Sequence, residues 1–559
     1  MKKYIQWIAP ILLVFIALFP LAAFFVPGLP HGHDAQDHVV RIANFYKALT
    51  EGVIFPRWGG NLNWGYGHPV MMFLYPCSSY IASFFHFVGL SFVDATKAVF
   101  VVAYIGSILT MYLWMNAAWG RRAGIIGALL YGFAPYRFVD IYVRMAIGEH
   151  MAFVFPPLIM YFLYKLATSI VSPKNQELRT RNYMLGLGVS FALLVLSHNA
   201  IALMFIPIIG LYGLYLFFTE AKKNFLFFVY CFMSFGLGFG LSAFFWIPGF
   251  IEGKYTLRNI VTAGEALQRF VPFTAFFYSP WDYGGNTTLT KEVGIAQWLG
   301  FLISCIVFIK TKDKHMRILL LVSGLSFFVS LFIMTGASWW IWKQMMILQN
   351  FQFPVRFLST TVFITAVIGG IAIPYISRNY ELRTKNLVFF VFCLVPIVST
   401  IHMWHPKDYQ REPESFYTRV YPGTTDTGES TPIWTTRFQE EYPKAPMELI
   451  SGEARITPGK RTTTIHEYTI EASTRAELME NTLYFPGWTV LVDGVVIEPE
   501  FQSGLHRGIM TFWVSEGVHS VSVEFRDTKI RRIAQYISIG SVVLSLVSIG
   551  FYSIWKKRT

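Results

Sequence analysis

Three histidines, two aspartates and one arginine lie within the eleven residues of the stretch HGHDAQDHVVR, residues 31–41. If a helix begins near Asp34, then Asp34, Asp37, His38 and Arg41 share one face, because helical residues three, four and seven positions apart lie together. Either aspartate, held at the rim of a cavity, can act as a general base toward an acceptor hydroxyl group. The same two aspartates can also simply cap the helix and interact with the positive end of its dipole.

The same stretch offers a second chemistry, which is metal binding. His31, His33, Asp34, Asp37 and His38 carry side chains that suit zinc or manganese. Their spacing matches no established metal-binding pattern. We therefore expect no cofactor, with a divalent metal at these five residues as the alternative.

A second stretch, PRWGGNLNWGYGHPVMMFLYP, is rich in glycine and aromatic residues and covers residues 56–76. Arg57 is a candidate ligand of a donor phosphate, because a guanidinium group can donate two parallel hydrogen bonds to phosphate oxygens. Trp58 and Tyr66 are candidates for stacking on sugar rings. Both could instead belong to an aromatic belt at the membrane interface.

Ionisable side chains also occur at the ends of apolar stretches, where they are costly and usually face a cavity or one another. Arg137, Asp140 and Arg144 lie on one helix face and could form an ion-pair ladder, although one aspartate cannot neutralise two arginines. Arg356 follows Pro354 and would enter the membrane unless it meets an anion or extends its side chain to the headgroups. The candidates for the rest of the substrate pocket are His33, His38, Arg41, Trp58, Tyr66, Arg137, Glu149, His198 and Glu252.

The elements that must position these residues are membrane helices. The chain has 559 residues, of which 54% are hydrophobic and 14% charged, and it contains several runs of about 20 apolar residues, enough to cross a bilayer as helix. The composition predicts an α-helical polytopic membrane protein, with an uncleaved first span at the N-terminus. We expect about twelve spans, near residues 6–26, 93–117, 122–138, 147–167, 183–198, 200–218, 225–247, 293–310, 316–336, 356–376, 386–402 and 533–555.

The net charge of +13 would suit nucleic-acid binding, but the basic residues lie in short connections between apolar runs, which favours a membrane protein and no nucleic-acid partner. Every second connection is basic. The basic residues are Lys2, Lys3, Arg121, Arg122, Lys174, Arg179, Arg181, Lys222, Lys223, Lys310, Lys312, Lys314, Arg317, Arg378, Arg383, Lys385, Lys556, Lys557 and Arg558. By the positive-inside rule, both termini are cytoplasmic in the cell membrane. Residues 27–92, 248–292, 337–355 and 403–532 then face outward.

Residues 403–532 read as a β-rich domain. RTTTIHEYTIEA alternates with a period of two, and WTVLVDGVVIEP predicts a hairpin with Asp493 and Gly494 at its turn. Two more strands are expected around Glu516 and Gly517, and such patterns are typical of small antiparallel sandwiches. We therefore divide the chain into a transmembrane domain at 1–402, an outer β-rich domain at 403–532, and a last helix with a basic tail at 533–559.

The order of several motifs resembles that of the bacterial membrane proteins called 6-pyruvoyl-tetrahydropterin synthase-related. They look like members of the GT-C superfamily of glycosyltransferases. The matching stretches are HDAQDHVVRI, PRWGGNLNWGYGHPVMMFLYP, APYRFVDIYVRMAIGE, LSHN, LSAFFWIP, FQFPVRFL and YFPGWTVLVDG. The resemblance implies a polyprenyl-phosphate-sugar donor, inverting transfer to an acceptor outside the membrane, and a catalytic aspartate in the first outer loop. By motif that aspartate is Asp34, with Asp37 as the other candidate, and Arg57, Arg144 and Arg356 would hold the phosphate.

Together these observations predict an integral membrane glycosyltransferase that uses a lipid-linked sugar and a glycan or polymer acceptor of the cell envelope. A transporter or flippase of lipid-linked sugars would share the cations and the cavity but would need no base. A non-catalytic envelope assembly protein would depend on its β-rich domain and not on Asp34.

Overall fold

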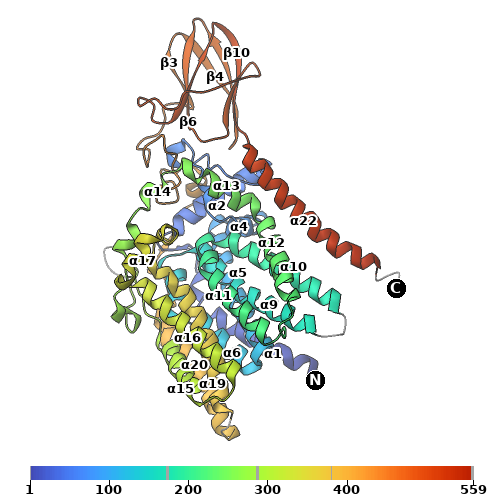
Figure 1. Ribbon diagram of the computed structural model, residues 1–559. Helices are drawn as coiled ribbons and strands as arrows, with labels where there is room; N and C mark the ends of the chain where they lie inside the picture. The colour runs from blue at the N-terminus through green and yellow to red at the C-terminus, as the bar shows by residue number, and fades with distance from the viewer. Residues whose placement is uncertain (1, 172–175, 285–288, 379–380, 556–559) are drawn as a thin grey trace. The chain divides into compact units, whose positions relative to one another are not determined.

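The computed structural model describes residues 2–171, 176–284, 289–378 and 381–555 (Figure 1). The basic positions Lys174, Lys556, Lys557 and Arg558 lie outside the described residues. The chain forms two compact units. Unit 1 comprises Met1–Ala35, Lys97–Ser242 and Gly264–Arg411, and unit 2 comprises Gln36–Thr96, Ala243–Ala263 and Glu412–Thr559. The first predicted outer loop is divided between them, so that Asp34 belongs to unit 1 and Asp37 to unit 2.

Unit 1 is helical. Its longer helices are α1 (Lys2–Leu18), α5 (Phe92–Trp119), α6 (Arg121–Gly132), α9 (Phe155–Val171), α10 (Gln176–Ser197), α11 (Asn199–Phe218), α12 (Leu226–Leu241), α15 (Ile295–Lys310), α16 (Lys314–Met334), α19 (Leu358–Ser377) and α20 (Leu382–Thr400). Its shorter helices are α7 (Pro135–Phe138), a π-helical turn (Val139–Val143), α8 (Ile147–Ala152), α17 (Trp339–Gln344) and α18 (Met346–Gln349). Two short strands, β1 (Leu29–Pro30) and β2 (Tyr409–Gln410), pair antiparallel.

Helix α19 forms the centre of unit 1, where it packs against α6, α15, α16 and α20. It is almost entirely buried, and glycines allow its neighbours to approach closely. A Cβ atom on Gly370 would lie 3.0 Å from the Cα of Gly127, and one on Gly300 would lie 3.2 Å from the Cα of Gly369. Small residues commonly allow such close packing between membrane helices. A single 3₁₀ turn, Pro354–Phe357, leads into α19 and places Arg356 at its beginning.

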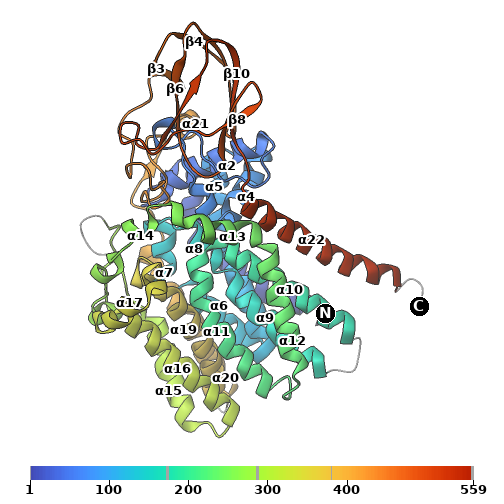
Figure 2. The same cartoon turned by 45° about the horizontal axis from the view of Figure 1, so that its top comes forward.

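Unit 2 combines helices with two antiparallel sheets (Figure 2). Its helices are α2 (Ala35–Thr50), α3 (Val70–Phe73), α4 (Cys77–Phe87), α13 (Ala243–Glu252), α14 (Arg258–Val261), α21 (Glu414–Thr418) and α22 (Lys529–Trp555). Its strands are β3 (Met447–Ser451), β4 (Ala454–Arg461), β5 (Ile465–Ala472), β6 (Ala476–Leu483), β7 (Trp488–Val492), β8 (Val495–Ile497), β9 (Ile509–Val514) and β10 (Gly517–Phe525). The sheet orders are β4-β5-β10-β7-β8 and β3-β6-β9.

The predicted hairpin is confirmed. Strands β7 and β8 pair antiparallel, and the two turn residues Asp493 and Gly494 have φ values of 51° and 81°. Two consecutive positive φ values are typical of the tight turn that matches the twist of paired strands. The core between the sheets also takes in Trp58, whose ring lies 5.3 Å from that of Trp488, and Tyr66. Part of the first predicted outer loop therefore completes the sandwich.

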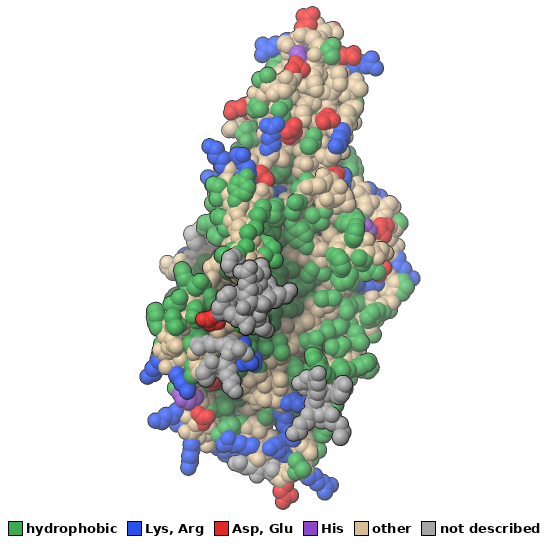
Figure 3. Space-filling view, turned by 90° about the vertical axis from the view of Figure 1, so that its right-hand side faces the viewer, with side chains coloured by type: hydrophobic (Ala, Val, Ile, Leu, Met, Phe, Trp, Pro, Cys, Tyr) green, Lys and Arg blue, Asp and Glu red, His purple; other side chains and the backbone are tan. Residues whose placement is uncertain are grey.

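In the described part of the chain, seven helices are long and apolar enough to cross a membrane. They are Phe92–Trp119, Ile147–Val171, Asn199–Phe218, Lys314–Met334, Pro354–Ser377, Leu382–Met403 and Lys529–Ser548. Apolar side chains cover much of the surface, as Figure 3 shows for one face. The protein is therefore a multi-pass helical membrane protein with a β-rich domain before its last helix, as predicted. The number of twelve spans stays a prediction, since α12 and α15, for example, have only 16 residues each.

The predicted span at 122–138 is wrong as a single helix. Helix α6 ends at Gly132, and Pro135 occupies the first turn of the next helix, α7. Proline has no backbone N–H and is tolerated in a first turn but not inside a helix. The break brings the chain into a short irregular segment, and this segment carries Arg137, Asp140 and Arg144.

Candidate active site

A group of charged side chains in unit 1, which we call the arginine cluster, consists of Tyr136, Asp140, Arg144, Glu149 and Arg356. The Arg144 guanidinium donates to Asp140 Oδ1 at 2.7 Å and to Glu149 Oε2 at 2.9 Å. It also donates to the Tyr136 hydroxyl group at 3.0 Å, and that hydroxyl group donates to Glu149 Oε1 at 2.5 Å. Four of the five residues therefore come from the break after α6 and from α8.

Arg356 reaches the same carboxylate from the turn before α19. Its Nε lies 3.6 Å from Glu149 Oε2, within ion-pair distance but too far for a hydrogen bond. In the described part of the chain, this buried Nε has no hydrogen-bond acceptor. The Arg356 and Arg144 side chains keep 14% and 11% of their surface exposed, whereas Glu149 keeps 1%. Glu149 thus holds two arginines, and the side chain of each stays partly exposed.

Asp34 is attached to this cluster through its backbone. The N–H groups of His33 and Asp34 donate to the carbonyl groups of Val143 and Arg144, at 2.9 and 3.0 Å. Gly32 permits this approach, since a Cβ there would lie 2.3 Å from Cγ of Met145. The Asp34 carboxylate is exposed and directly precedes α2, and within the described ranges it has no hydrogen bond or ion pair. Its charge nevertheless attracts Arg144 electrostatically.

The arginines near this site outnumber the buried carboxylates. Arg137 is fully buried, donates to the Ser107 hydroxyl group at 2.8 Å, and lies 4.0 Å over the ring of Phe153. Its charge acts on Asp140 and Glu149, so three arginines share two buried carboxylates. The predicted ladder of Arg137, Asp140 and Arg144 is therefore incomplete, because among the described residues Asp140 pairs with Arg144 and not with Arg137. The surplus of positive charge suits an anion.

An apolar cavity of about 290 Å³ lies among other helices of unit 1. It is lined by residues of α5, α9, α11, α16 and α19, among them Trp114, Met160, Tyr212, Val322 and Phe363. On α19, Phe363 and Val367 follow Arg356 by 7 and 11 residues, which corresponds to about 10 to 16 Å along a helix. The segment that carries Arg356 at its beginning therefore contributes to an apolar cavity farther along.

The histidines of residues 31–38 point to different partners. His31 pairs with Asp408 at 2.7 Å, and His33 Nε2 lies 2.8 Å from the carbonyl oxygen of Tyr283. His38 Nδ1 lies 3.2 Å from the Arg41 guanidinium. Among the described residues, no group of three or more His, Cys, Asp or Glu side chains is arranged to hold a metal ion.

Asp37 lies in the first turn of α2 and is held within unit 2. The Tyr421 hydroxyl group donates to Asp37 Oδ1 at 2.9 Å and accepts a hydrogen bond from the Gln36 amide at 2.9 Å. Burial, followed by the charge of Asp37, raises the pKa of Tyr421, so this tyrosine stays protonated and remains a donor. One turn later, Arg41 donates to Thr425. The polar face predicted for this helix is therefore occupied by the segment that follows α21.

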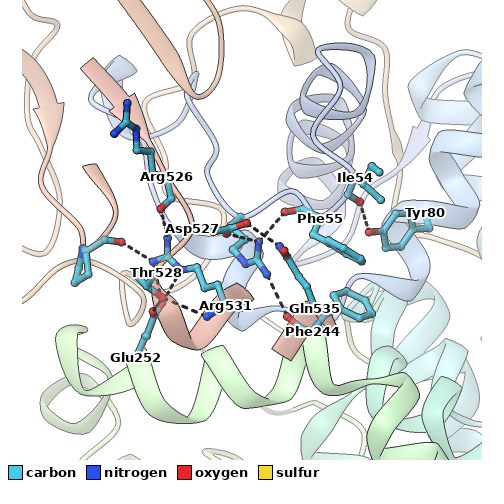
Figure 4. Close-up of polar contacts among 12 residues, drawn as sticks. Ile54, Phe55, Tyr80, Phe244, Glu252, Arg526, Asp527, Thr528, Arg531 and Gln535 are labelled. Atoms are coloured by element: carbon cyan, nitrogen blue, oxygen red, sulfur yellow. Dashed lines mark hydrogen bonds and ion pairs between the residues drawn. The ribbon is translucent and has the colours of Figure 1, made fainter. Parts of the chain in front are cut away.

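Arg57 and Glu252 belong to a second charged group, the arginine clamp, which consists of Arg57, Glu252, Asp527 and Arg531. Figure 4 labels Glu252, Asp527 and Arg531 of this clamp. Arg57 donates to Asp527 Oδ1 at 2.9 Å, and Arg531 donates to Glu252 Oε2 at 2.8 Å. Thr528 and Gln535 complete the clamp, with hydrogen bonds of 2.6 Å to Glu252 and 2.8 Å to Asp527. Each arginine thus has a carboxylate of its own.

Burial lowers the pKa of Arg57, while Asp527 acts in the opposite direction. The structure therefore assigns the charges of Arg57 and Glu252 to the clamp, and the rings of Trp58 and Tyr66 to the sandwich core. Of the predicted site residues, the structure brings together Asp34, Arg144, Glu149 and Arg356. Tyr136, which bridges Arg144 and Glu149, was missed because an aromatic residue at a membrane boundary carries no signal of that role.

No protein-family model and no curated protein matches the sequence. Among solved structures, the apo oligosaccharyltransferase of Archaeoglobus fulgidus is similar at 14% identity, over 78% of this chain and 62% of that chain, with a TM-score of 0.41. Arabinofuranosyltransferase AftD from Mycobacteria is similar at 9% identity, over 72% and 27%, with a TM-score of 0.42. ArnT from Cupriavidus metallidurans bound to undecaprenyl phosphate is similar at 10% identity, over 71% and 89%, with a TM-score of 0.28.

This chain therefore spans less than two thirds of the archaeal protein and about a quarter of the mycobacterial one. Because their TM-scores lie below 0.5, the likeness is loose, and neither a family nor a substrate follows from it.

Proposed function

We propose that this protein is a membrane glycosyltransferase that transfers a sugar from a polyprenyl-phosphate donor to an acceptor outside the membrane, with inversion at the anomeric carbon. One observation supports this most strongly. The exposed Asp34 carboxylate is fixed by its backbone to Arg144, and Arg144 shares the buried Glu149 with Arg356. A candidate base and two candidate phosphate ligands thus lie together in one unit.

In this proposal, the Asp34 carboxylate takes the proton from the acceptor hydroxyl group while the oxygen of that hydroxyl group attacks the anomeric carbon. The bond between that carbon and the phosphate oxygen breaks, and its electron pair leaves with the phosphate. Arg144 and Arg356 stabilise the negative charge that develops there. The partial exposure of both side chains, and the lack of a hydrogen bond at Arg356 Nε, support this assignment within the described residues.

The apolar cavity supports a lipid-linked donor. A polyprenyl phosphate has an anionic end and a long apolar chain, and α19 combines Arg356 at its beginning with cavity residues farther along. A soluble nucleotide-sugar would make no use of that cavity. The basic connections between apolar runs support an orientation of the protein in which both termini are cytoplasmic. In this proposal, the acceptor on the other side of the membrane belongs to the cell envelope.

The test compares the purified wild type with Asp34→Asn in mild detergent, with bound lipids identified by mass spectrometry. Asp34→Asn should carry an intact polyprenyl-phosphate-sugar, whose mass gives the sugar class, and should lose about 10²- to 10⁴-fold in transfer rate. Asp408→Asn is the matched control, since Asp408 is also an exposed aspartate of unit 1 but is paired with His31. It should behave like the wild type.

Two outcomes would contradict the proposal. Full transfer activity in a folded Asp34→Asn protein would remove Asp34 as the base, and bound donor lipid at equal levels in both proteins would then favour a transporter. Absence of any isoprenoid phosphate from both proteins would remove the donor assignment and favour an assembly protein.

A further inference from the structure

Arg137 adjoins the arginine cluster without forming an ion pair in it. It is fully buried in α7 and directly follows Tyr136, whose hydroxyl group donates to Glu149 Oε1 at 2.5 Å. The π-helical turn (Val139–Val143) continues from α7 and leads to Arg144. The contacts that fix Arg137 therefore also fix the short segment from which Tyr136 and Arg144 reach Glu149.

Three aromatic rings form a cage around the Arg137 guanidinium. Its Cζ lies over the ring of Phe153 at 4.0 Å from the centroid, over that of Tyr104 at 5.5 Å, and over that of Tyr131 at 5.6 Å. A cation within about 6 Å of a ring centroid is attracted to the ring, most strongly where water is excluded. The rings come from α5, from α6 and from the residue after α8, so the guanidinium joins these three elements to α7.

The cage rings are themselves fixed at the break between α6 and α7. The Tyr104 hydroxyl group donates to the carbonyl oxygen of Gly132, the last residue of α6, at 3.0 Å. The Tyr131 hydroxyl group donates to the carbonyl oxygen of Phe153 at 2.8 Å. Phe153 directly follows α8, the helix that carries Glu149. The cage therefore connects the end of α6 with both elements that contribute carboxylate and hydroxyl groups to the cluster.

The charge of Arg137 is not neutralised by a hydrogen-bonded carboxylate. Its Nη2 donates to Ser107 Oγ of α5 at 2.8 Å, and that hydroxyl group donates to the carbonyl oxygen of Tyr104 at 2.8 Å. Its Nε and Nη1 are buried and have no hydrogen-bond partner among the residues that the structure describes. Such a buried cation is unfavourable for stability, and apolar residues in place of buried charged groups are often neutral or stabilising. Packing alone therefore does not account for an arginine at this position.

We infer that Arg137 is a positioning residue of the phosphate site, which fixes α7 and α8 to α5 and α6. This inference rests on the proposed function. Arg137 is fully buried and acts through Tyr136 and Glu149, which hold the Arg144 guanidinium where the donor phosphate would bind. A displacement of about 1 Å at such a group can cost up to 10²-fold, so a loosened α7 should weaken the recognition of the phosphate.

The experiment measures phosphate recognition separately from stability. The full-length protein in detergent is titrated with undecaprenyl phosphate and with undecaprenol, which has the same chain and no phosphate, and its Tm is measured without lipid. Arg137→Met keeps a long flexible side chain but removes the cation and its hydrogen bond to Ser107. Arg137→Lys keeps a cation that can contact the same rings and the same hydroxyl group.

Arg137→Met should bind undecaprenyl phosphate about tenfold more weakly and undecaprenol like the wild type, with a Tm equal to or above that of the wild type. Arg137→Lys should recover most of the affinity for the phosphate. A folded Arg137→Met that binds undecaprenyl phosphate like the wild type would overturn the inference and leave the proposed function standing. An equal loss of affinity for both lipids would also overturn it, because the damage would then not concern the phosphate.

Ser107→Ala keeps the test decisive if Arg137→Met does not fold. This variant removes the acceptor of Arg137 Nη2 and should weaken the binding of undecaprenyl phosphate by about threefold or more. Unchanged affinity would overturn the inference in that case. Ser190→Ala is the matched control, since the hydroxyl group of this buried serine donates to Gly186 within α10, and it should bind both lipids like the wild type.

The two lipids also distinguish failure of this inference from failure of the proposed function. If the wild type does not bind undecaprenyl phosphate more tightly than undecaprenol, the protein does not recognise the phosphate. The proposed function then fails, and the role of Arg137 fails with it.

Discussion

The arginine cluster of unit 1 and the arginine clamp of unit 2 are built from the same residue types but differ in how their charges are matched. In the clamp, Arg57 and Arg531 are 7% and 0% exposed, and each forms an ion pair with a different carboxylate. In the cluster, Arg144 and Arg356 share Glu149. Arg137 adds a third guanidinium, while Asp140 is the only other buried carboxylate of the cluster.

The difference indicates which arginines are available to a ligand. A buried ion pair whose partners are matched one to one has no capacity for another anion, and its removal leaves an uncompensated charge. A group with more guanidinium groups than buried carboxylates, and with arginine side chains that are partly exposed, gains from an additional anion. We therefore expect substitutions in the clamp to lower stability, and substitutions in the cluster to lower activity.

The largest effect is expected for Arg531→Gln. The variant would leave Glu252, which is 4% exposed, without its charged partner, and it should lose about 3–5 kcal/mol of stability. Thermal unfolding of the detergent-solubilised protein would measure the loss. The double variant Arg531→Gln with Glu252→Gln should recover much of it, because no buried charge then remains unpaired. An unchanged Tm in the single variant would show that the clamp does not stabilise the protein.

Arg356→Gln should have the next largest effect, and on activity. Glu149 would keep its ion pair with Arg144, so the Tm should stay close to that of the wild type. Loss of one cation at the leaving phosphate should lower kcat about 10²- to 10³-fold. Arg57→Gln is the matched control from the clamp and should lower the Tm but keep the activity of the folded fraction. If Arg356→Gln instead lowered the Tm and Arg57→Gln instead lowered the activity, the roles assigned to the cluster and the clamp would be contradicted.

A smaller effect is expected for Tyr136→Phe. The hydroxyl group that this variant loses bridges Arg144 and Glu149, and a hydrogen bond to a charged group contributes about 1.5–3 kcal/mol. We expect KM for the lipid donor to rise about tenfold or more. Tyr142→Phe removes a buried hydroxyl group that donates to Pro20 and lies outside the cluster, and it should leave this KM unchanged.

The smallest effect concerns the pH dependence of stability and Glu480, a further buried carboxylate that lies in the β-sandwich. Its Oε1 accepts from His466 at 2.8 Å and from Arg461 and Thr482 at 3.0 Å. Burial raises the pKa of Glu480, but the hydrogen bond and charge of His466, followed by Arg461, outweigh it, so the pKa lies below its usual value.

A lowered pKa means that ionised Glu480 stabilises the folded state. This contribution is fully present above the ordinary glutamate pKa of about 4.3 and is lost as pH falls through the lower folded-state pKa. The difference in Tm between the wild type and Glu480→Gln should therefore shrink as pH falls from 6 to 3. A difference that stays constant over that range would show that Glu480 is not ionised in the fold.

Local patterns predicted the elements better than they predicted the partners. The period of two in residues 461–472 and the Asp493-Gly494 turn led to strand β5 and to the β7–β8 hairpin, because strand alternation and turn geometry depend on neighbouring residues. The break after Gly132 was missed because the apolar run continues through it, although Pro135 was present as a signal. The sequence was compatible with Trp58 as a sugar-stacking residue or as a residue of the interfacial belt. Neither prediction placed Trp58 in the core of the sandwich, where the structure has it.

The sequence by itself determined that this chain is a helical membrane protein with a β-rich domain, since apolar length and strand period are local properties. It also determined which stretches carry the ionisable residues. Only the tertiary structure decided which arginines are matched by carboxylates. The partner of Arg57 lies 470 positions away and that of Arg531 lies 279 positions away, and no local pattern encodes such pairings. The positive charge that is available to a ligand is the arginine charge that these ion pairs between distant residues do not neutralise.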